Sequence, residues 1–256
     1  MSITSLALKI AAPIPDIEKY DSFLFIGPHP DDIEIGAGAT AAKLCEAGKR
    51  VGFLCCIDGR FGDCNAPVHG DELAALRQKE GRESAEYLGV KSLEFLNFCD
   101  AGFYDFKELE REIARYVGEF KPQVIFAPDF FVSSECHADH VNVGKAAAHV
   151  AHNAPYPRLM EHYGAESAPV EAIAFYMTAK PNFFVKTGKR LVEKQLHSVF
   201  GIHLSQFPEG CGDAKSISLY TVLRSFDFGL RSLKGRAEGF RVLGRVHMHC
   251  LPEAGK

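Results

Sequence analysis

The sequence predicts an α/β fold in which a mostly parallel sheet carries helices on both of its faces. Two observations lead to this prediction. The apolar runs 23–26 and 124–127 contain no polar residue, which is typical of strands that helices cover on both sides. Such runs alternate along the chain with longer amphipathic segments, and parallel neighbouring strands need a crossover between them that is usually helical.

Each element is delimited by its own residues. Strands are short apolar runs that end at turn residues, and helices show apolar residues three or four positions apart before a stop at Gly48, Gly89 or Lys121-Pro122. The predicted strands are 23–26, 51–57, 93–96, 124–127, 173–177, 183–185 and 240–247. The predicted helices are 36–48, 71–89, 109–120, 141–152, 188–200 and 216–231.

The pattern weakens after the fourth strand. Segment 153–170 contains three prolines, and we expect an excursion or a lid there. No internal repeat and no long linker interrupts the chain. A single domain over 1–256, more variable from about residue 153, is therefore predicted.

Composition excludes several classes of protein. The hydrophobic fraction of 46% and the charged fraction of 24% are ordinary for a soluble globular chain, and a net charge of -4 gives no general attraction for nucleic acid. No apolar run approaches the ~18 residues that a membrane span needs. The eight cysteines form no Cys-x-x-Cys pair and no signal peptide precedes them, so we expect reduced thiols and a cytoplasmic location.

Polar side chains that can bind a metal follow two of the predicted strands. His29, Asp31 and Asp32 come after strand 23–26, and His137 and His140 come after strand 124–127. Ligands of open α/β sheets bind at the carboxyl ends of the strands. Catalytic zinc takes three His, Asp or Glu ligands and keeps an open position. We therefore predict His29, Asp32 and His140 as ligands of zinc or another divalent metal, provided that the two strands are neighbours.

Asp31 lies beside a predicted ligand and is free to act as the general base on a bound water, whose pKa a metal lowers from 15.7 to about 7. Other interpretations stay open at this point. Asp31 or Asp32 could cap the following helix, and His137 and His140 could be ordinary loop residues. A dinucleotide site is disfavoured, because no G-x-G-x-x-G follows the first strand.

These residues carry a resemblance to a known family. The segment from His29 to Glu34 resembles the HPDDxE signature of the LmbE-like (PIG-L) N-acetylglucosaminyl de-N-acetylases, and the segment from His137 to His140 matches their HxDH signature. Further similarities lie at Asp58-Gly59, Arg77-x-x-Glu80, Leu88-Gly89-Val90, His203-x-Ser205-Gln206 and Ala237-Glu238-Gly239-Phe240-Arg241. Together they extend from about residue 22 to residue 243.

The resemblance implies a Rossmann-like fold, one divalent metal, usually zinc, and hydrolysis of the N-acetyl group of an amino sugar. Carried over by position, His29, Asp32 and His140 are the ligands and Asp31 is the base. His137 stabilises the oxyanion or protonates the leaving amine, and Asp139 holds it. Many relatives form trimers or hexamers, so the resemblance also implies a homo-oligomer.

Two positions limit the resemblance. Arg60 stands where many relatives have an acidic residue, and it either contacts an anionic part of the substrate or is merely solvated. His203 is carried over only as a substrate contact, because the lysine spacing before it differs from the common pattern. Besides an N-acetylglucosamine glycoside or glycolipid head group, the substrate could be another N-acyl or sugar–thiol amide. A silent sugar-binding protein is the alternative outside enzymes, and the intact Asp31 disfavours it.

Overall fold

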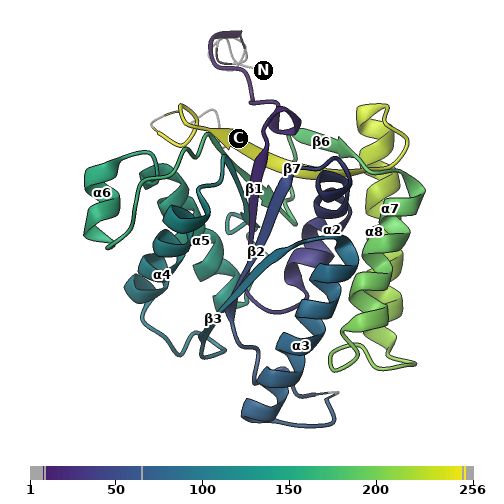
Figure 1. Ribbon diagram of the computed structural model, residues 1–256. Helices are drawn as coiled ribbons and strands as arrows, with labels where there is room; N and C mark the ends of the chain where they lie inside the picture. The colour runs from purple at the N-terminus through teal and green to yellow at the C-terminus, as the bar shows by residue number, and fades with distance from the viewer. Residues whose placement is uncertain (1–7, 9, 65, 250, 252–256) are drawn as a thin grey trace.

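A computed structural model describes residues 8, 10–64, 66–249 and 251 of the chain. Seven strands form one sheet in the order β3-β2-β1-β4-β5-β7-β6. Strands β1 to β5 pair in parallel, whereas β7 pairs antiparallel with both β5 and β6. The predicted fold class, a mostly parallel sheet with helices on both faces, is confirmed (Figure 1).

All seven predicted strands are present with shifts of up to three residues at their ends. The strands are β1 (Ser22–Gly27), β2 (Arg50–Ile57), β3 (Ser92–Phe98), β4 (Val124–Pro128), β5 (Ala172–Tyr176), β6 (Phe183–Lys186) and β7 (Ala237–Gly244). The helices are η1 (Ile17–Lys19), α2 (Asp32–Glu46), α3 (Gly70–Leu88), α4 (Phe106–Phe120), α5 (Ala138–Asn153), α6 (Pro157–His162), α7 (Gly188–His197), η2 (Ser198–Ile202) and α8 (Gly212–Ser232).

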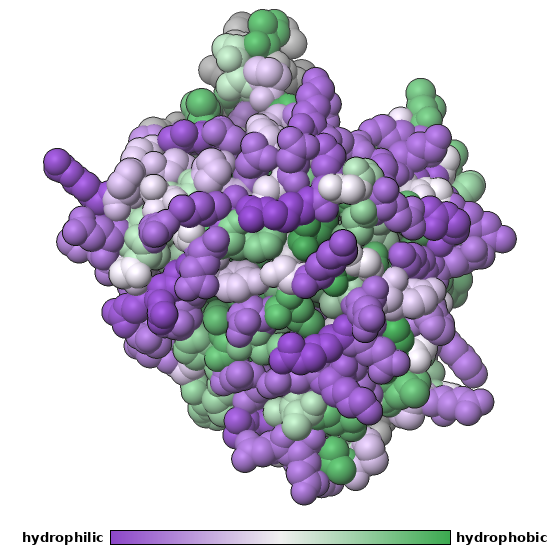
Figure 2. Space-filling view, in the orientation of Figure 1, coloured by the Kyte–Doolittle hydropathy of each residue, from purple (hydrophilic) through white to green (hydrophobic). Residues whose placement is uncertain are grey.

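The core has one part on each face of the sheet. On one face, Ile113 of α4 and Val150 of α5 pack against the strands. On the other face, Ala39 of α2, Leu88 of α3 and Leu191 of α7 do the same. Burying these apolar faces holds the helices to the sheet. Hydrophilic residues cover much of the face seen in Figure 2, with apolar residues showing between them.

Among the helices that begin earlier than predicted, two carry proposed metal ligands. Helix α2 begins at Asp32, not at residue 36, and α5 begins at Ala138, not at residue 141. Asp32 and His140 therefore lie in the first turns of helices, where backbone N–H groups and the helix dipole face the sheet edge. Gly36 of α2 lies so close to Tyr176 of β5 that a Cβ atom would stand 2.2 Å from its ring. This approach agrees with the small residues of that helix.

Segment 153–170 is an excursion, and the lid interpretation is wrong. Met160, Ala168 and Val170 are buried in the same core as α4 and α5. Gly118 of α4 leaves no room for a Cβ atom, because the Glu166 carbonyl oxygen would lie 2.6 Å from it. The segment thus packs on the outside of α4 and α5. Within the described part of the chain, no helix is both long enough and apolar enough to span a membrane.

Candidate active site

The edge formed by the carboxyl ends of β1 and β4 brings the two predicted polar clusters together. Strands β1 and β4 are parallel neighbours, with Phe23 opposite Val124 and Phe25 opposite Phe126. The condition that the sequence analysis placed on His140 is therefore met. His29 leaves β1 directly before α2, and His140 lies in the first turn of α5.

Asp32 connects the two clusters. Its Oδ2 accepts a hydrogen bond from the backbone N–H of His29 at 2.9 Å and lies 3.1 Å from His29 Nδ1. The same oxygen is 3.4 Å from His140 Nε2. The other nitrogen of His140, Nδ1, lies 3.0 Å from Glu135 Oε2. Each imidazole is thus oriented by a carboxylate, as is usual for metal-binding histidines.

Two further carboxylates face His29 from the other side. Its Nε2 lies 3.2 Å from Asp100 Oδ1 and 3.2 Å from Asp139 Oδ2. Asp139 is fully buried and accepts hydrogen bonds from the N–H of Gly102 at 2.9 Å and from the Tyr104 hydroxyl at 2.9 Å. Asp100, which the sequence analysis did not select, follows β3, the next parallel strand but one. Asp100 follows a predicted strand at the same edge of the sheet, and this position was the signal by which the sequence could have identified it.

The arrangement fits a divalent cation. Ligand atoms of His29, His137 and His140 lie within 4.8 Å of one another, and so do those of His29, Asp100, His137 and Asp139. Asp32 belongs to neither set, but its Oδ2 lies beside ring nitrogens of both His29 and His140. Three carboxylates around one buried imidazole are an excess of negative charge that a bound dication offsets. Imidazole and carboxylate donors suit zinc and similar metals.

The adjacent residues Asp31 and Asp32 have opposite electrostatic environments. Burial raises the pKa of Asp31 to about 6, against the lowering effect of Arg77. Burial acts in the same direction on Asp32, but His140 and His29 outweigh it and hold the pKa of that carboxyl well below its usual range. Two carboxyls with separated pKa values are typical of acid–base sites.

Asp31 also has a strained backbone. Its φ of 134° lies in a region that L side chains rarely adopt. It precedes α2, but its side chain makes no capping hydrogen bond, so it is no side-chain cap. Arg77 of α3 instead donates to Asp31 Oδ2 at 3.3 Å and to the Pro30 carbonyl at 3.2 Å. The turn therefore aims the Asp31 carboxylate toward Arg77 and away from the helix.

His137 does have a capping role. It precedes α5, and its Nδ1 accepts a hydrogen bond from the N–H of Asp139 at 3.3 Å. Its ring stacks on that of His140 with centroids 4.6 Å apart. Burial, with the neighbouring His29 and His140, lowers the pKa of His137. A neutral imidazole thus stands at the rim of the cluster, 44% exposed.

The two residues expected to contact substrate are each paired with a carboxylate of their own surroundings. Arg60 donates from Nε to Asp58 Oδ2 at 2.7 Å, and its guanidinium is 3.0 Å from Asp71. His203 has no exposed surface and lies 3.3 Å from Glu34 Oε1. The predicted contacts of Arg60 and His203 with substrate stay predictions.

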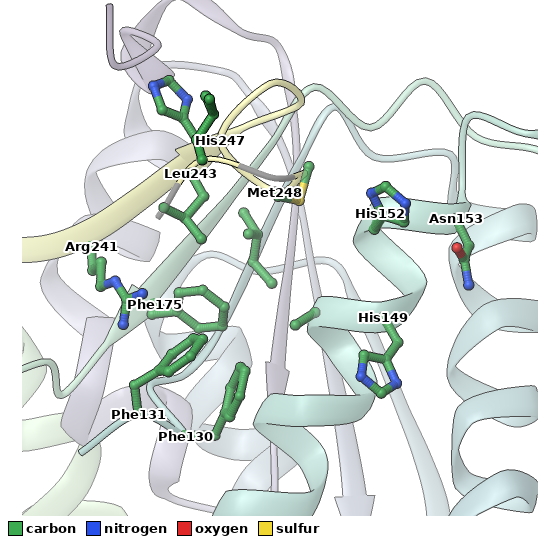
Figure 3. A pocket seen from close by; sticks show the side chains of 13 residues that line it. Phe130, Phe131, His149, His152, Asn153, Phe175, Arg241, Leu243, His247 and Met248 are labelled. Atoms are coloured by element: carbon green, nitrogen blue, oxygen red, sulfur yellow. The ribbon is translucent and has the colours of Figure 1, made fainter. Parts of the chain in front are cut away.

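A cavity of about 390 Å³ opens beside the cluster. Its lining includes Asp32, Glu135 and His140 together with Met177 and Tyr220. A cavity of about 670 Å³ lies elsewhere, between α5 and β7 (Figure 3). Its lining contains no predicted site residue and no carboxylate, but many apolar and aromatic side chains. The smaller cavity is therefore the candidate substrate site.

Comparison with known proteins supplies related chains. The family model described as PIG-L, GlcNAc-PI de-N-acetylase, matches residues 24–151. A diacetylchitobiose deacetylase from Thermococcus kodakarensis is 33% identical over 255 residues, which cover 98% of this chain and 93% of the relative. A 1D-myo-inositol 2-acetamido-2-deoxy-alpha-D-glucopyranoside deacetylase from Kineococcus radiotolerans is 30% identical over 171 residues, which cover 53% of this chain and 46% of the relative.

A solved structure is similar over nearly the whole length. The N,N'-diacetylchitobiose deacetylase from Pyrococcus horikoshii, determined with an inhibitor, superposes with a TM-score of 0.86 at 28% identity. The match covers 98% of this chain and 97% of that one. The similarity thus includes the antiparallel strands and α8, which lie outside the region that the family model matches.

Proposed function

We propose that this chain, which belongs to the PIG-L family of GlcNAc-PI de-N-acetylases, is a zinc-dependent enzyme. It would remove the acetyl group from an N-acetylglucosamine-type sugar. The observation that carries the proposal is the meeting of His29, Asp32 and His140 at one sheet edge, with Asp31 next to Asp32 in the chain and close enough to Asp32 and His29 to interact with their charges. The named substrates of the relatives, a chitobiose and an inositol glycoside, support an amino sugar as the substrate.

His29, Asp32 and His140 would hold the metal. When bound, zinc activates water and polarises the amide carbonyl. Glu135 fixes the ring of His140 through Nδ1, and Asp32 accepts the backbone N–H of His29, so the ligands are oriented in advance. Asp100 and Asp139 keep His29 in place from its other side.

Asp31 would take the proton from the attacking water. A pKa of about 6 suits this role, because a general base works best when its pKa is near the operating pH. Arg77 holds the Asp31 carboxylate by a charged hydrogen bond, which fixes its direction. The strained backbone at this residue is consistent with selection for geometry over stability.

His137 would act on the other side of the amide. The ring is exposed at the rim, so the Nε2–H of the neutral imidazole can donate a hydrogen bond to the oxyanion; it could protonate the leaving amine only after taking up a proton itself, such as the one that Asp31 removes from the attacking water. The backbone N–H of Asp139 donates a hydrogen bond to His137 Nδ1 at 3.3 Å and holds this ring. Without a proton donor, the amine nitrogen is a poor leaving group.

The test is acetate release from N-acetylglucosamine, diacetylchitobiose and an N-acetylglucosaminyl inositol, with and without a chelator. We expect the chelated protein to lose activity and to regain it with zinc. Asp31→Asn should keep the metal, measured by plasma mass spectrometry, but release acetate about 10²–10⁴-fold more slowly. Asp21→Asn is the control, because Asp21 lies at the opposite end of β1 and is exposed.

Each alternative has its own outcome in this assay. Wild-type activity in Asp31→Asn would show that the base assignment is wrong. Activity that persists with chelator would contradict the metal mechanism. Release of a different acyl group, or sugar binding without hydrolysis, would favour the other amidase or the silent sugar-binding protein.

A further inference from the structure

Helix α2, which carries Asp32 in its first turn, is broken shortly after its start. Ala37 has a φ of -152° and a ψ of 15°, which are not helical values. Residues 32–36, here called the first segment of α2, therefore lie between this break and Asp31 with its φ of 134°. A helix of little more than one turn is unstable by itself, because it fixes many dihedral angles for few hydrogen bonds. The segment that carries a proposed metal ligand is consequently held by other parts of the chain.

Gln195 of α7 holds the backbone of this first segment. Helix α7 lies beside α2 (Figure 1), and the Gln195 Nε2 donates hydrogen bonds to the carbonyl oxygen of Glu34 at 2.8 Å and to that of Ile35 at 3.1 Å. Gln195 is 2% exposed, and a carbonyl oxygen that loses its donor in such a buried place is costly. Both carbonyls closely precede the break at Ala37. One buried amide group therefore fixes the end of the first segment.

Two further buried side chains hold the helix on either side of the break. Before the break, the Glu34 carboxylate lies 3.3 Å from His203 Nε2. After the break, the Glu238 carboxylate of β7 accepts a hydrogen bond from the Thr40 N–H at 2.7 Å. Like Gln195, these partners come from the part of the chain beyond residue 151, where the match to the family model ends. The C-terminal part thus determines the course of the helix that begins at the site.

We propose that Gln195 is a positioning residue for the metal site, because fixing the first segment of α2 sets the direction of the Asp32 carboxylate. Asp32 Oδ2 lies between two imidazoles, at 3.1 Å from His29 Nδ1 and 3.4 Å from His140 Nε2. A small rotation of the segment would bring this oxygen nearer to one ring and farther from the other. The inference rests on the proposed function, and it adds a residue that the sequence analysis did not select.

The experiment measures the zinc affinity of metal-free protein by competition with a chromophoric chelator. Gln195→Met removes both donated hydrogen bonds but keeps an unbranched side chain of similar size. We expect this variant to bind zinc about 10–100-fold more weakly than wild type, as is usual when a residue that orients a metal ligand is lost. Its acetate release at saturating zinc should fall as well.

Leu191→Ala is the matched control. Leu191 is buried on α7 one turn before Gln195, and its side chain has no hydrogen-bonding group. The variant should melt at a lower temperature, because a buried side chain is lost, but its zinc affinity should equal that of wild type. A purely structural role for Gln195 would instead give both variants the same zinc affinity at a similar loss of melting temperature.

A second measurement does not depend on zinc. Amide hydrogen exchange of the metal-free proteins, followed by mass spectrometry, reports how firmly residues 35–40 around the break are held. Gln195→Met should accelerate exchange there, whereas Leu191→Ala should leave it near the wild-type rate. If wild type binds no zinc, the proposed function fails, and the exchange rates alone decide whether Gln195 holds the segment.

Gly38→Ala tests the same contact from α2 and decides the question if Gln195→Met does not fold. A Cβ atom at Gly38 would lie 3.1 Å from Gln195 Cγ, so the glutamine side chain would have to shift. Although alanine favours a helix more than glycine does, zinc affinity should fall in this variant too, by a smaller factor than in Gln195→Met.

Three results would overturn the proposal. The first is a Gln195→Met protein with wild-type zinc affinity and wild-type exchange around the break. The second is a Leu191→Ala protein that loses as much zinc affinity as Gln195→Met. The third, where Gln195→Met does not fold, is a Gly38→Ala protein that binds zinc as tightly as wild type.

Discussion

Two cavities of this molecule share the loop that follows β4. Asp129, Val132 and Glu135 of that loop line the cavity beside His140, whereas Phe130 and Phe131 line the cavity between α5 and β7. The first holds about 390 Å³ and meets the imidazole and carboxylate cluster at Asp32 and His140. The second holds about 670 Å³ and is largely apolar (Figure 3).

The comparison teaches that volume does not locate the chemistry in this fold. Amide hydrolysis needs a base, a proton donor and an electrophile near one point, and of these two cavities only the smaller one is lined by carboxylates and by proposed metal ligands, Asp32 and His140. The larger cavity is lined by histidines but by no carboxylate, and His149 pairs with Glu110, which is buried away from it. Substitutions in the smaller cavity should consequently change zinc content and acetate release, whereas substitutions in the larger cavity should change the free energy of unfolding.

The largest effect is expected at His140. His140→Ala removes a proposed metal ligand, so bound zinc should fall to trace levels and acetate release should drop by about 10³-fold or more. His149→Ala is the control, because His149 lies on the same helix, α5, but lines the larger cavity. Plasma mass spectrometry and initial rates measure both variants. Equal zinc content in the two variants would contradict the conclusion that the metal site belongs to the smaller cavity.

The larger cavity should instead respond in stability. Phe175 is fully buried in β5 and contacts Phe130 with ring centroids 5.7 Å apart. Phe175→Ala should lower the free energy of unfolding by about 3–4 kcal/mol, because a buried aromatic side chain is lost and space is left behind. Zinc content and acetate release per folded molecule should stay near wild type.

Urea unfolding measures this change, with Phe103→Ala as its control. Phe103 is 73% exposed, so its removal should change the free energy of unfolding by no more than about 0.5 kcal/mol. A Phe175→Ala protein that is as stable as wild type but has lost its zinc would connect the two cavities. The division of roles between them would then be wrong.

Sequence patterns predicted the first half of the fold better than the second. Strands β1 to β4 are apolar runs with clear stops, so their order and direction follow from the chain. The antiparallel position of β7 between β5 and β6 has no local signal, because it depends on which sheet edge remains free after the parallel part has formed. The same region holds segment 153–170, where prolines indicated an irregular path but not its packing on α4.

The candidate site divides in a similar way. His29, Asp32 and His140 lie in compact motifs, and the structure brings them together as expected. Asp100 and Glu135 are single acidic residues in loops, and a lone carboxylate in a loop has no pattern that sets it apart. Arg77 belonged to a recognised motif, but its contact with Asp31 crosses 46 residues of chain and depends on the packing of α3. Isolated residues therefore needed the fold before they could be assigned.

The smallest effect concerns a buried carboxyl outside both cavities, and it tests whether a perturbed pKa alone marks function. Burial raises the pKa of Glu238 to about 7 from 4.5, although a hydrogen bond from the Thr40 N–H at 2.7 Å opposes the shift. Asp31 shows a similar shift, but Glu238 has no imidazole cluster beside it. We therefore expect a pH effect on stability and none on catalysis.

The sign follows from proton binding. Between pH 4.5 and about 7 the folded protein keeps a proton on Glu238 that the unfolded chain has released, so this residue's contribution to stability is greatest at low pH and declines until pH 7. The decline should be on the order of 3 kcal/mol. Glu238→Gln keeps an acceptor for Thr40 and cannot ionise. Urea unfolding at pH 5 and pH 8 should therefore show a smaller loss of stability in this variant than in wild type, with equal acetate release. An identical pH dependence in the two proteins would mean that Glu238 does not titrate in this range.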